Sequence, residues 1–293
     1  MDINYELYKV FYHVASTLSF SEASKQLFIS QSAVSQSIKT LERKLDQVLF
    51  IRSTKKVQLT PEGEILLRYV EPAMNLIQRG ESQLAESAST GGQIRIGASD
   101  TICRYFLVPY IKQFHEAFPG AHIKVTNATS IHSVELLKSG QVDFIVVNSP
   151  NAYLESAFSV KRIKRFRDVF LASMTYGQLR GRRLSFAELL EYPILMLDRR
   201  STTSEFLHSL FQQHHLDLVP EVELSSNDLL IDLAKIGLGV AFLPDYCIPG
   251  GDDSLFAVET KEALPPRELL AVWNSRIPLS RAAAAFLDYF EEV

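Results

Sequence analysis

Apolar positions recur at helical spacing near the start of the chain, and one such stretch separates an apolar side from a polar one. From Ser30 to Leu45, the residues Val34, Ile38 and Leu41 follow at intervals of three or four, on one side of a helix. The opposite side carries Ser32, Ser35, Gln36 and Lys39. Serine and glutamine can exchange hydrogen bonds with base edges, and lysine can meet a phosphate. We therefore interpret this segment as a helix that reads DNA.

Two further helical patterns precede this segment. Residues 4–15 carry apolar side chains at helical spacing, and we expect a second short helix to begin at Ser21, with Ala23 and Leu27 facing inward. Ser30 can cap the next helix across a short turn. This is the helix-turn-helix arrangement that lays its second helix in the major groove.

A β-wing is predicted directly after the helices. Two short apolar segments, residues 48–51 and 57–59, enclose a basic tip. The cations of this tip can reach phosphates or the minor groove. They are Arg52, Lys55 and Lys56.

One long helix is predicted from Thr60 to about Glu86. Thr60 can cap it and Pro61 suits its first position. An apolar seam follows at intervals of four and three, made of Leu66, Val70, Ala73, Ile77, Gly80 and Leu84. Such a seam suits pairing with an identical helix, and the alternative is packing on its own domain. The small residues from Ser87 to Gly92 then predict a hinge.

The remaining two hundred residues alternate short apolar strands with helices, which is typical of an α/β sheet. Hydroxyl side chains repeatedly stand where a strand ends and a helix begins. They are Ser99, Thr101, Thr129, Ser130, Ser201 and Thr202. Open α/β sheets bind ligands at the carboxyl ends of their strands, where helix N-termini offer N–H groups to an anion. Each hydroxyl could instead only cap its helix, but together they indicate a small anionic effector such as a carboxylate.

The N-terminal motifs resemble those of LysR-type transcriptional regulators. The matching residues are Phe20-Ser-Glu-Ala23, Leu27, Ile29-Ser-Gln-Ser-Ala-Val-Ser35, Ile38, Leu41-Glu42, Leu45, Leu49-Phe50, Arg52 and Leu59-Thr-Pro-Glu-Gly63. The chain departs from the family at Asp46, where glycine is usual, but aspartate tolerates a left-handed turn better than most side chains. Leu137–Phe144 and Gly237–Pro244 also match the family, and we include Phe242 from the second segment as a candidate effector contact.

The resemblance implies a mainly α winged helix-turn-helix domain in residues 1–59 and a linker or dimerisation helix in residues 60–88. Residues 89–293 would form a two-lobed, periplasmic-binding-protein-like (type 2) effector domain with the ligand between its lobes. Lobe I would comprise about 92–161 and 267–293, and lobe II about 162–266. The DNA-binding residues would be Ser21, Gln31, Ser32, Ser35, Gln36, Lys39, Arg52, Lys55 and Lys56.

The same resemblance implies the partners and the mode of action. A homodimer or homotetramer would bind double-stranded promoter DNA, with RNA polymerase as a further partner. The effector would shift lobe closure and thereby the separation of the DNA-binding pairs. Its effect requires different affinities for the two states.

Composition and charge agree with this organisation. The chain has 46% hydrophobic residues, no apolar run of about 18 residues and no charged-then-apolar leader, so we expect a cytoplasmic protein outside the membrane. Its two cysteines, Cys103 and Cys247, form no CxxC pair, which argues against a disulfide framework and a zinc site. Residues 1–60 hold eight Lys or Arg and five Asp or Glu, a net +3, whereas the rest carries −7. This asymmetry places a polyanionic partner at the N-terminal domain.

Two rival functions stay open. One is an enzyme on the same two-lobed fold, although the chain shows no nucleophile elbow, no Gly-rich phosphate loop and no catalytic or cofactor motif. The other is a DNA-bending or scaffold protein whose C-terminal domain binds nothing.

Three smaller features have alternative interpretations. His214-His215 suggests an exposed helix end rather than a metal site. Residues 161–165 with Arg167 suggest a solvated edge strand between the lobes rather than a second nucleic-acid patch. Cys103 suggests a small core hydrophobe rather than a thiol sensor.

Overall fold

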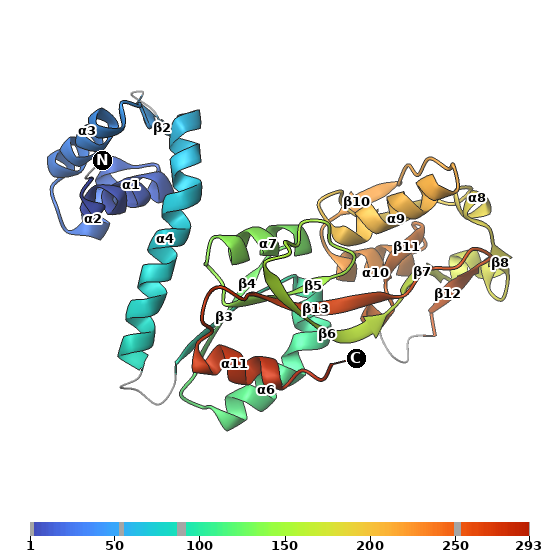
Figure 1. Cartoon of the computed structure of the whole chain (residues 1–293). Helices are drawn as coiled ribbons and strands as arrows, with labels where there is room; N and C mark the ends of the chain where they lie inside the picture. Colours follow the sequence, from blue (N-terminus) through green and yellow to red (C-terminus); the bar gives the residue numbers. More distant parts are fainter. Residues whose placement is uncertain (1–2, 53–55, 87–91, 249–252, 293) are drawn as a thin grey trace. The chain divides into compact units, whose positions relative to one another are not determined.

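The computed structural model describes residues 3–52, 56–86, 92–248 and 253–292, and its elements are labelled in Figure 1. For residues 52, 85 and 86 the structure describes the backbone but not the side chains. Nearly all of the expected hinge at 87–92 lies outside the described residues. The chain forms two compact units that divide near residue 88. Each unit is described by itself.

The N-terminal unit is a winged helix-turn-helix followed by a long helix. Its elements are α1 (Tyr5–Thr17), α2 (Phe20–Leu27), α3 (Gln31–Leu45), β1 (Phe50–Arg52), β2 (Val57–Leu59) and α4 (Pro61–Glu86). The apolar side of α3, made of Val34, Ile38 and Leu41, is fully buried against Phe11 and Val14 of α1. The predicted helix-turn-helix and wing are therefore confirmed.

Side-chain caps set where the short helices begin. The Ser30 hydroxyl accepts the Ala33 N–H and begins α3 as predicted. The expected start of α2 at Ser21 is wrong, because Ser19 accepts the Glu22 N–H and α2 begins at Phe20. A serine stands at both positions, and only the extended backbone of Ser19 allows its side chain to cap.

The wing is joined to the helices by three residues of the matched motifs. The Glu42 carboxylate accepts the Leu49 N–H at 2.9 Å, and the Thr60 hydroxyl donates to the Val48 carbonyl at 2.7 Å. Thr60 also accepts the Gly63 N–H, which caps α4 as predicted. A Cβ at Gly63 would collide with the Leu49 carbonyl oxygen, so the close approach of α4 to the wing requires glycine.

The end of α3 explains the departure from the family motif. Asp46 is left-handed, with φ 52° and ψ 39°, and its N–H bonds the Glu42 carbonyl. Glycine would adopt this conformation without strain, and aspartate is one of the side chains that tolerate it. The C-cap is therefore preserved.

The apolar seam predicted on α4 is partly wrong. Leu66 and Val70 pack into the core of the winged helix together with Met74, whose sulfur accepts the Tyr5 hydroxyl. The large apolar side chains that α4 leaves exposed are Ile65, Tyr69, Leu76, Ile77 and Leu84. The first part of the seam is thus core, whereas its later members Ile77 and Leu84 belong to the exposed apolar surface of the helix.

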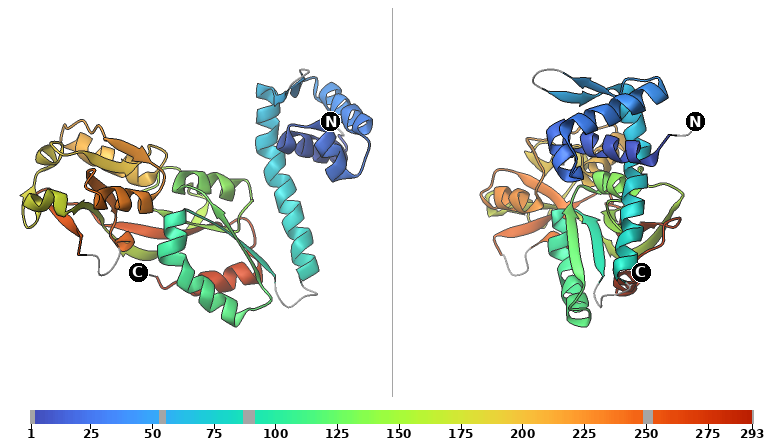
Figure 2. Two further views of the ribbon diagram at one scale, coloured as in Figure 1. Left: turned by 180° about the vertical axis from the view of Figure 1, so that it is seen from behind. Right: turned by 90° about the vertical axis from the view of Figure 1, so that its left-hand side faces the viewer.

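The second unit contains two mixed sheets (Figures 1 and 2). The first, with strand order β4-β3-β5-β13-β6, is built from β3 (Gln93–Ala98), β4 (His122–Asn127), β5 (Phe144–Asn148), β6 (Phe158–Phe166) and β13 (Arg267–Asn274). We call this sheet and its helices lobe I. The helical segments are α5 (Asp100–Ile102), a π-helical turn at Cys103–Leu107, α6 (Val108–Ala117), α7 (Ser130–Lys138) and α11 (Arg281–Asp288).

The second sheet, with its helices, forms lobe II and has the order β10-β9-β11-β7-β12-β8. Its strands are β7 (Asp168–Ser173), β8 (Arg183–Leu184), β9 (Ile194–Leu197), β10 (Val222–Leu224), β11 (Val240–Pro244) and β12 (Leu255–Thr260). The helical segments are the 3-10 turns Met174–Leu179 and Asp245–Cys247, and α8 (Phe186–Leu189), α9 (Thr202–Gln213) and α10 (Asn227–Lys235). The alternation of strands and helices predicted from the sequence, and with it the α/β class, is confirmed.

Two chain crossings join the lobes. Strand β6 pairs with β13 up to Phe166, so the first crossing is at Arg167 and not after residue 161 as expected. The second crossing ends where β13 begins at Arg267. β6 is an edge strand, as predicted, and its Arg162 and Arg165 lie 3.2 and 3.7 Å from Glu268 of β13.

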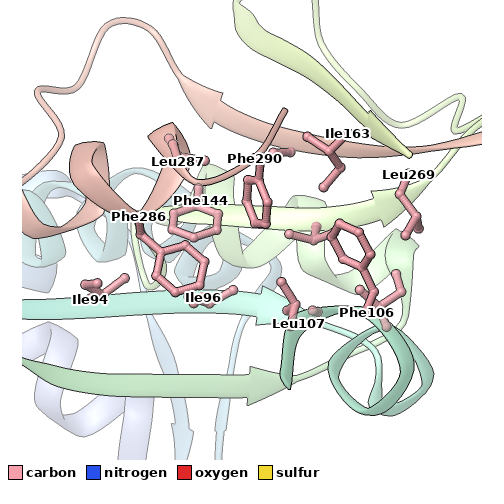
Figure 3. Close-up of a cluster of buried hydrophobic side chains, with 14 of the residues drawn as sticks. Ile94, Ile96, Phe106, Leu107, Phe144, Ile163, Leu269, Phe286, Leu287 and Phe290 are labelled. Atoms are coloured by element: carbon pink, nitrogen blue, oxygen red, sulfur yellow. The ribbon is translucent and has the colours of Figure 1, made fainter. Parts of the chain in front are cut away.

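Aromatic side chains fill the core of lobe I. Figure 3 shows Phe286 of α11 and Phe290, which follows the end of this helix, lying against Phe144 of β5. The ring centroids of Phe286 and Phe290 are 5.6 and 6.4 Å from that of Phe144. Both faces of β5 are buried, as expected for a central strand covered by helices on each side. The loops at the strand ends of lobe I are therefore attached to a sheet that is packed on both faces.

Candidate functional site

Two regions can carry chemistry: the polar side of α3 and the space between the lobes. On α3, Gln31, Ser32, Gln36 and Lys39 are exposed while Ser35 is half-buried. The Ser32 hydroxyl shares a hydrogen bond of 2.9 Å with Ser30, so it is partly engaged by the cap. The helix therefore offers amide, hydroxyl and ammonium groups on the side opposite its buried stripe.

The remaining predicted DNA contacts are less well placed. Ser21 is exposed on α2, and its carbonyl accepts the Ser24 hydroxyl. Lys56 is exposed directly before β2, at the tip end of the wing. Lys55 and the Arg52 side chain lie outside the described residues.

The cleft between the lobes contains a cavity of about 450 Å³. Lobe I contributes Thr129, Ile131, His132, Glu135 and Tyr153, and lobe II contributes Arg199, Arg200 and Glu205. The Tyr153 hydroxyl donates to Glu205 across this cleft at 3.3 Å. His132 Nδ1 lies 2.9 Å from the Glu135 carboxylate. The Arg200 guanidinium, by contrast, forms no ion pair with any of the described residues. A free guanidinium in a cavity of ligand size favours a ligand that carries negative charge.

The predicted hydroxyls are divided between capping and cleft positions. Ser99, Thr129 and Ser201 accept N–H groups of their own helices and act as caps. Thr129 also lines the cavity. The other three hydroxyls have partners elsewhere. Ser130 accepts the Asn148 N–H, and Thr101 accepts a hydrogen bond from the side-chain amide of Asn227 in lobe II at 2.9 Å. Thr202 is buried beside Arg267.

Phe242 cannot be an effector contact. Its side chain is fully buried in the core of lobe II, with its ring 4.9 Å from that of Phe170. It lies on β11 between two neighbouring strands, where an apolar side chain stabilises the sheet instead of facing a cleft. The matched segment around it therefore reflects core packing.

Sequence reasoning missed Arg267, the first residue of β13. Its guanidinium is buried to within 1% exposure and lies 2.8 Å from the equally buried Asp168 of β7. It also reaches Thr203 and Thr202 at the start of α9, at 3.2 and 3.5 Å. Burial raises the pKa of the Asp168 carboxyl, although the Arg267 charge opposes this shift. The only sequence signal was an arginine two residues before the apolar run Leu269–Trp273.

Another interlobe contact is made by residues of the π-helical turn. The Tyr105 hydroxyl donates to Asp228 of α10 at 2.6 Å, and Arg104 lies 3.6 Å from the same carboxylate. Burial and the bond to Asp228 raise the pKa of Tyr105 to about 12, so the phenol stays a donor near neutral pH. Single π turns are frequent where helices serve a function.

The described residues contain no cluster of three or more His, Cys, Asp or Glu that could hold a metal ion. His214 and His215 are exposed at the end of α9, as expected, and His214 meets the Phe186 ring edge-on at 5.2 Å. Across the same described residues, no helix is both long and apolar enough to cross a membrane.

Comparisons with known proteins agree with this arrangement. Residues 5–64 match the family model for the bacterial regulatory helix-turn-helix protein, lysR family, and residues 87–293 match the LysR substrate binding domain. The HTH-type transcriptional activator CmpR of Synechocystis sp. is 25% identical over 96% of this chain and 93% of its own length.

Two solved structures are similar in fold. A cysteine-to-aspartate variant of full-length OxyR from Pseudomonas aeruginosa has a TM-score of 0.73 at 20% identity and covers 98% of this chain and 94% of its own. Full-length CbnR in complex with its target DNA has a TM-score of 0.67 at 17% identity and covers 98% and 99%.

The thiol of Cys103 is predicted to react slowly. Burial, with a smaller contribution from Asp100, raises its pKa to about 11. Because the thiolate is the nucleophile, alkylation by iodoacetamide at pH 8 should be roughly a hundredfold slower than for a thiol of ordinary pKa. Mass spectrometry of the Cys103 peptide, with the denatured chain as control, measures the rate. Alkylation as fast as in the denatured chain would contradict the assignment and favour thiol sensing.

Proposed function

The chain belongs to the LysR family of bacterial transcriptional regulators, and from that premise we propose that it reads promoter DNA through α3 and the wing and responds to a small anionic effector between its lobes. It is a DNA-binding regulator and not an enzyme. The observation that carries the DNA-binding part is α3, one side of which is buried while the other presents amide, hydroxyl and ammonium groups. Such groups can bond both base edges and phosphates.

The DNA-reading role predicts different effects for two neighbouring exposed residues. Gln36→Ala should lose a base contact and weaken binding to the specific site by roughly tenfold, while leaving random DNA unaffected. Lys39→Ala should remove a phosphate contact, weaken binding to both DNAs and reduce the salt dependence by about one ion. Fluorescence anisotropy with a promoter fragment and a shuffled duplex separates these effects. An equal loss on both duplexes from Gln36→Ala would disprove base reading.

We propose that α4 pairs the chain with a second copy. Its exposed apolar side includes Tyr69 at 75% and Leu84 at 78% exposure, together with Ile65 and Leu76. These residues repeat at helical spacing on a side that the winged helix leaves uncovered, and burying such a row stabilises helix pairing. The seam proposed from the sequence shares Ile77 and Leu84 with the exposed apolar side chains of α4 but not Leu66 or Val70.

The pairing predicts that Tyr69→Glu with Leu84→Glu converts the dimer into a monomer, because two charges would be buried at the interface. Gln78→Glu, also exposed on α4, is the matched control and should leave the dimer intact. Sedimentation velocity at micromolar concentration measures the outcome. A native chain that already sediments as a monomer would contradict the proposal.

We propose that the effector is a small anion bound in the cavity between the lobes. The exposed Arg200 guanidinium supports this, as do the Thr129 hydroxyl and the N-terminus of α9, which begins at Thr202, two residues after this arginine. The opposing glutamates, Glu135 and Glu205, are engaged by His132 and Tyr153. A carboxylate or phosphate ligand would therefore find a free cation among the described residues of the cavity wall.

The effector proposal predicts a thermal shift of the full chain with a member of a panel of small carboxylates, phosphate and sulfate. A ligand at about a hundred times its Kd adds roughly 2.7 kcal/mol, which corresponds to several degrees. Arg200→Gln should abolish the shift, whereas Arg182→Gln, an exposed arginine of the same lobe outside the cavity, should retain it. A shift that persists in Arg200→Gln would place the ligand elsewhere, and the absence of any shift across the panel would contradict an anionic effector of these classes.

A further inference from the structure

Arg267 contacts every segment that passes between the lobes. It begins β13, the end of the second crossing, and its Nη1 donates to Asp168, which begins β7 after the first crossing. Its Nε donates to the Ser149 carbonyl, directly after β5 of lobe I, at 2.7 Å. Nη1 also reaches the Thr203 hydroxyl of α9 in lobe II. One side chain thus connects both crossings, the end of a lobe I strand and the start of a lobe II helix.

Two aromatic rings lie close to the guanidinium. Its central carbon lies 5.3 Å from the Phe166 ring centroid and 4.7 Å from the Phe206 centroid, the first from β6 and the second from α9. Arginine can donate from a planar fork in several directions while stacking on aromatic faces, which lysine cannot do. The site therefore uses the geometry of arginine as well as its charge.

This arrangement is costly for stability alone. A buried ion pair often contributes no more than apolar side chains of similar volume would, because both charges lose their hydration. The other oxygen of Asp168, Oδ1, is buried and accepts no hydrogen bond from the described residues, and the Nη2 bond to Thr202 is at the long limit of 3.5 Å. The group is better explained by the geometry it imposes than by the stability it adds.

We propose that Arg267 is a positioning residue that holds the N-terminal turn of α9 against the lobe crossings and so sets the resting arrangement of the two lobes. The inference rests on the proposed function only in that Arg200 and the start of α9 border the proposed effector cavity. An anion that binds there acts on a helix end that Arg267 connects to lobe I. Movement of that end is thereby transmitted to both crossings.

The test is amide hydrogen exchange of the full chain without effector. Arg267→Lys keeps a cation for Asp168 but loses the fork and the stacking. We expect at least tenfold faster exchange in three segments together: the first turn of α9, residues 148–151 after β5, and residues 166–168 at the first crossing. Strands β3 and β11 should exchange as in the native chain. The matched control is Arg95→Lys, in which the ion pair with Asp143 at 3.8 Å lies within lobe I, and it should leave these three segments unchanged.

A second variant separates positioning from folding. Arg267→Met combined with Asp168→Leu removes both buried charges, so the melting temperature should stay within a few degrees of the native value. The three segments should nevertheless stay fast. Native protection in either variant would show that packing alone positions α9 and would overturn the proposal. Uniformly faster exchange throughout both lobes in Arg267→Lys would also overturn it, by reducing Arg267 to a stabilising residue. Because no effector is used, the result is independent of the thermal-shift panel.

Discussion

A buried guanidinium is the constraint around which the second unit is organised. Arg267 cannot be left without partners in the interior, because an unpaired buried charge costs several kcal/mol in most proteins. Its partners must therefore stay near it, and they belong to different lobes: Ser149 to lobe I, and Asp168 and Thr203 to lobe II. The main apolar cores of the two lobes are separate clusters, although Tyr246 of lobe II packs on the lobe I core and Tyr105 of lobe I packs on a lobe II cluster. The polar cluster between them specifies how the lobes meet, together with Tyr105 on Asp228 and Tyr153 on Glu205.

Hydrogen bonds can exchange partners at lower cost than a packed core can be rearranged, so a lobe arrangement set by polar contacts is open to control by a polar ligand.

The N-terminal unit meets a different demand, since α3 must be held firmly and still present a free side. Val34, Ile38 and Leu41 anchor it, Ser30 and Asp46 define its ends, and Glu42 connects it to the wing. None of these roles uses Gln36 or Lys39. The helix can therefore use its polar side for a partner without loss of fold stability. The same separation recurs on α4, where Val70 and Met74 pack inward while Tyr69 and Leu84 are exposed.

Charge is distributed to suit both tasks. The N-terminal sixty residues carry +3 within a chain of net charge −4, which favours a polyanion at that end without attracting it to the whole surface. Several cations of lobe I and lobe II are paired, as with Arg162 and Arg165 on Glu268 and Arg183 on Glu259. The exposed Arg200 differs from these in position, because it borders the cavity. Cys103 is removed from this chemistry by burial, which raises its pKa to about 11.

The sequence by itself determined those features that depend on neighbours along the chain. The helix-turn-helix, the wing, the caps at Ser30, Thr60 and Ser201 and most strands of the α/β unit follow from local spacing and capping chemistry.

The same reasoning failed where two local solutions were equally good or where distant partners decided. Ser19 and Ser21 are both acceptable caps, and the packing of Phe20 decides for the first. From the sequence, Leu66 and Val70 fit a dimerisation seam, but in the structure they pack into the core of the winged helix. Phe242 fits a ligand contact, but in the structure its ring packs against Phe170. The role of Arg267 could not be predicted from the sequence, because its partners Asp168, Ser149 and Thr203 lie far from it along the chain. Only the tertiary structure brings them together, since the burial of a charge depends on every segment that excludes water from it.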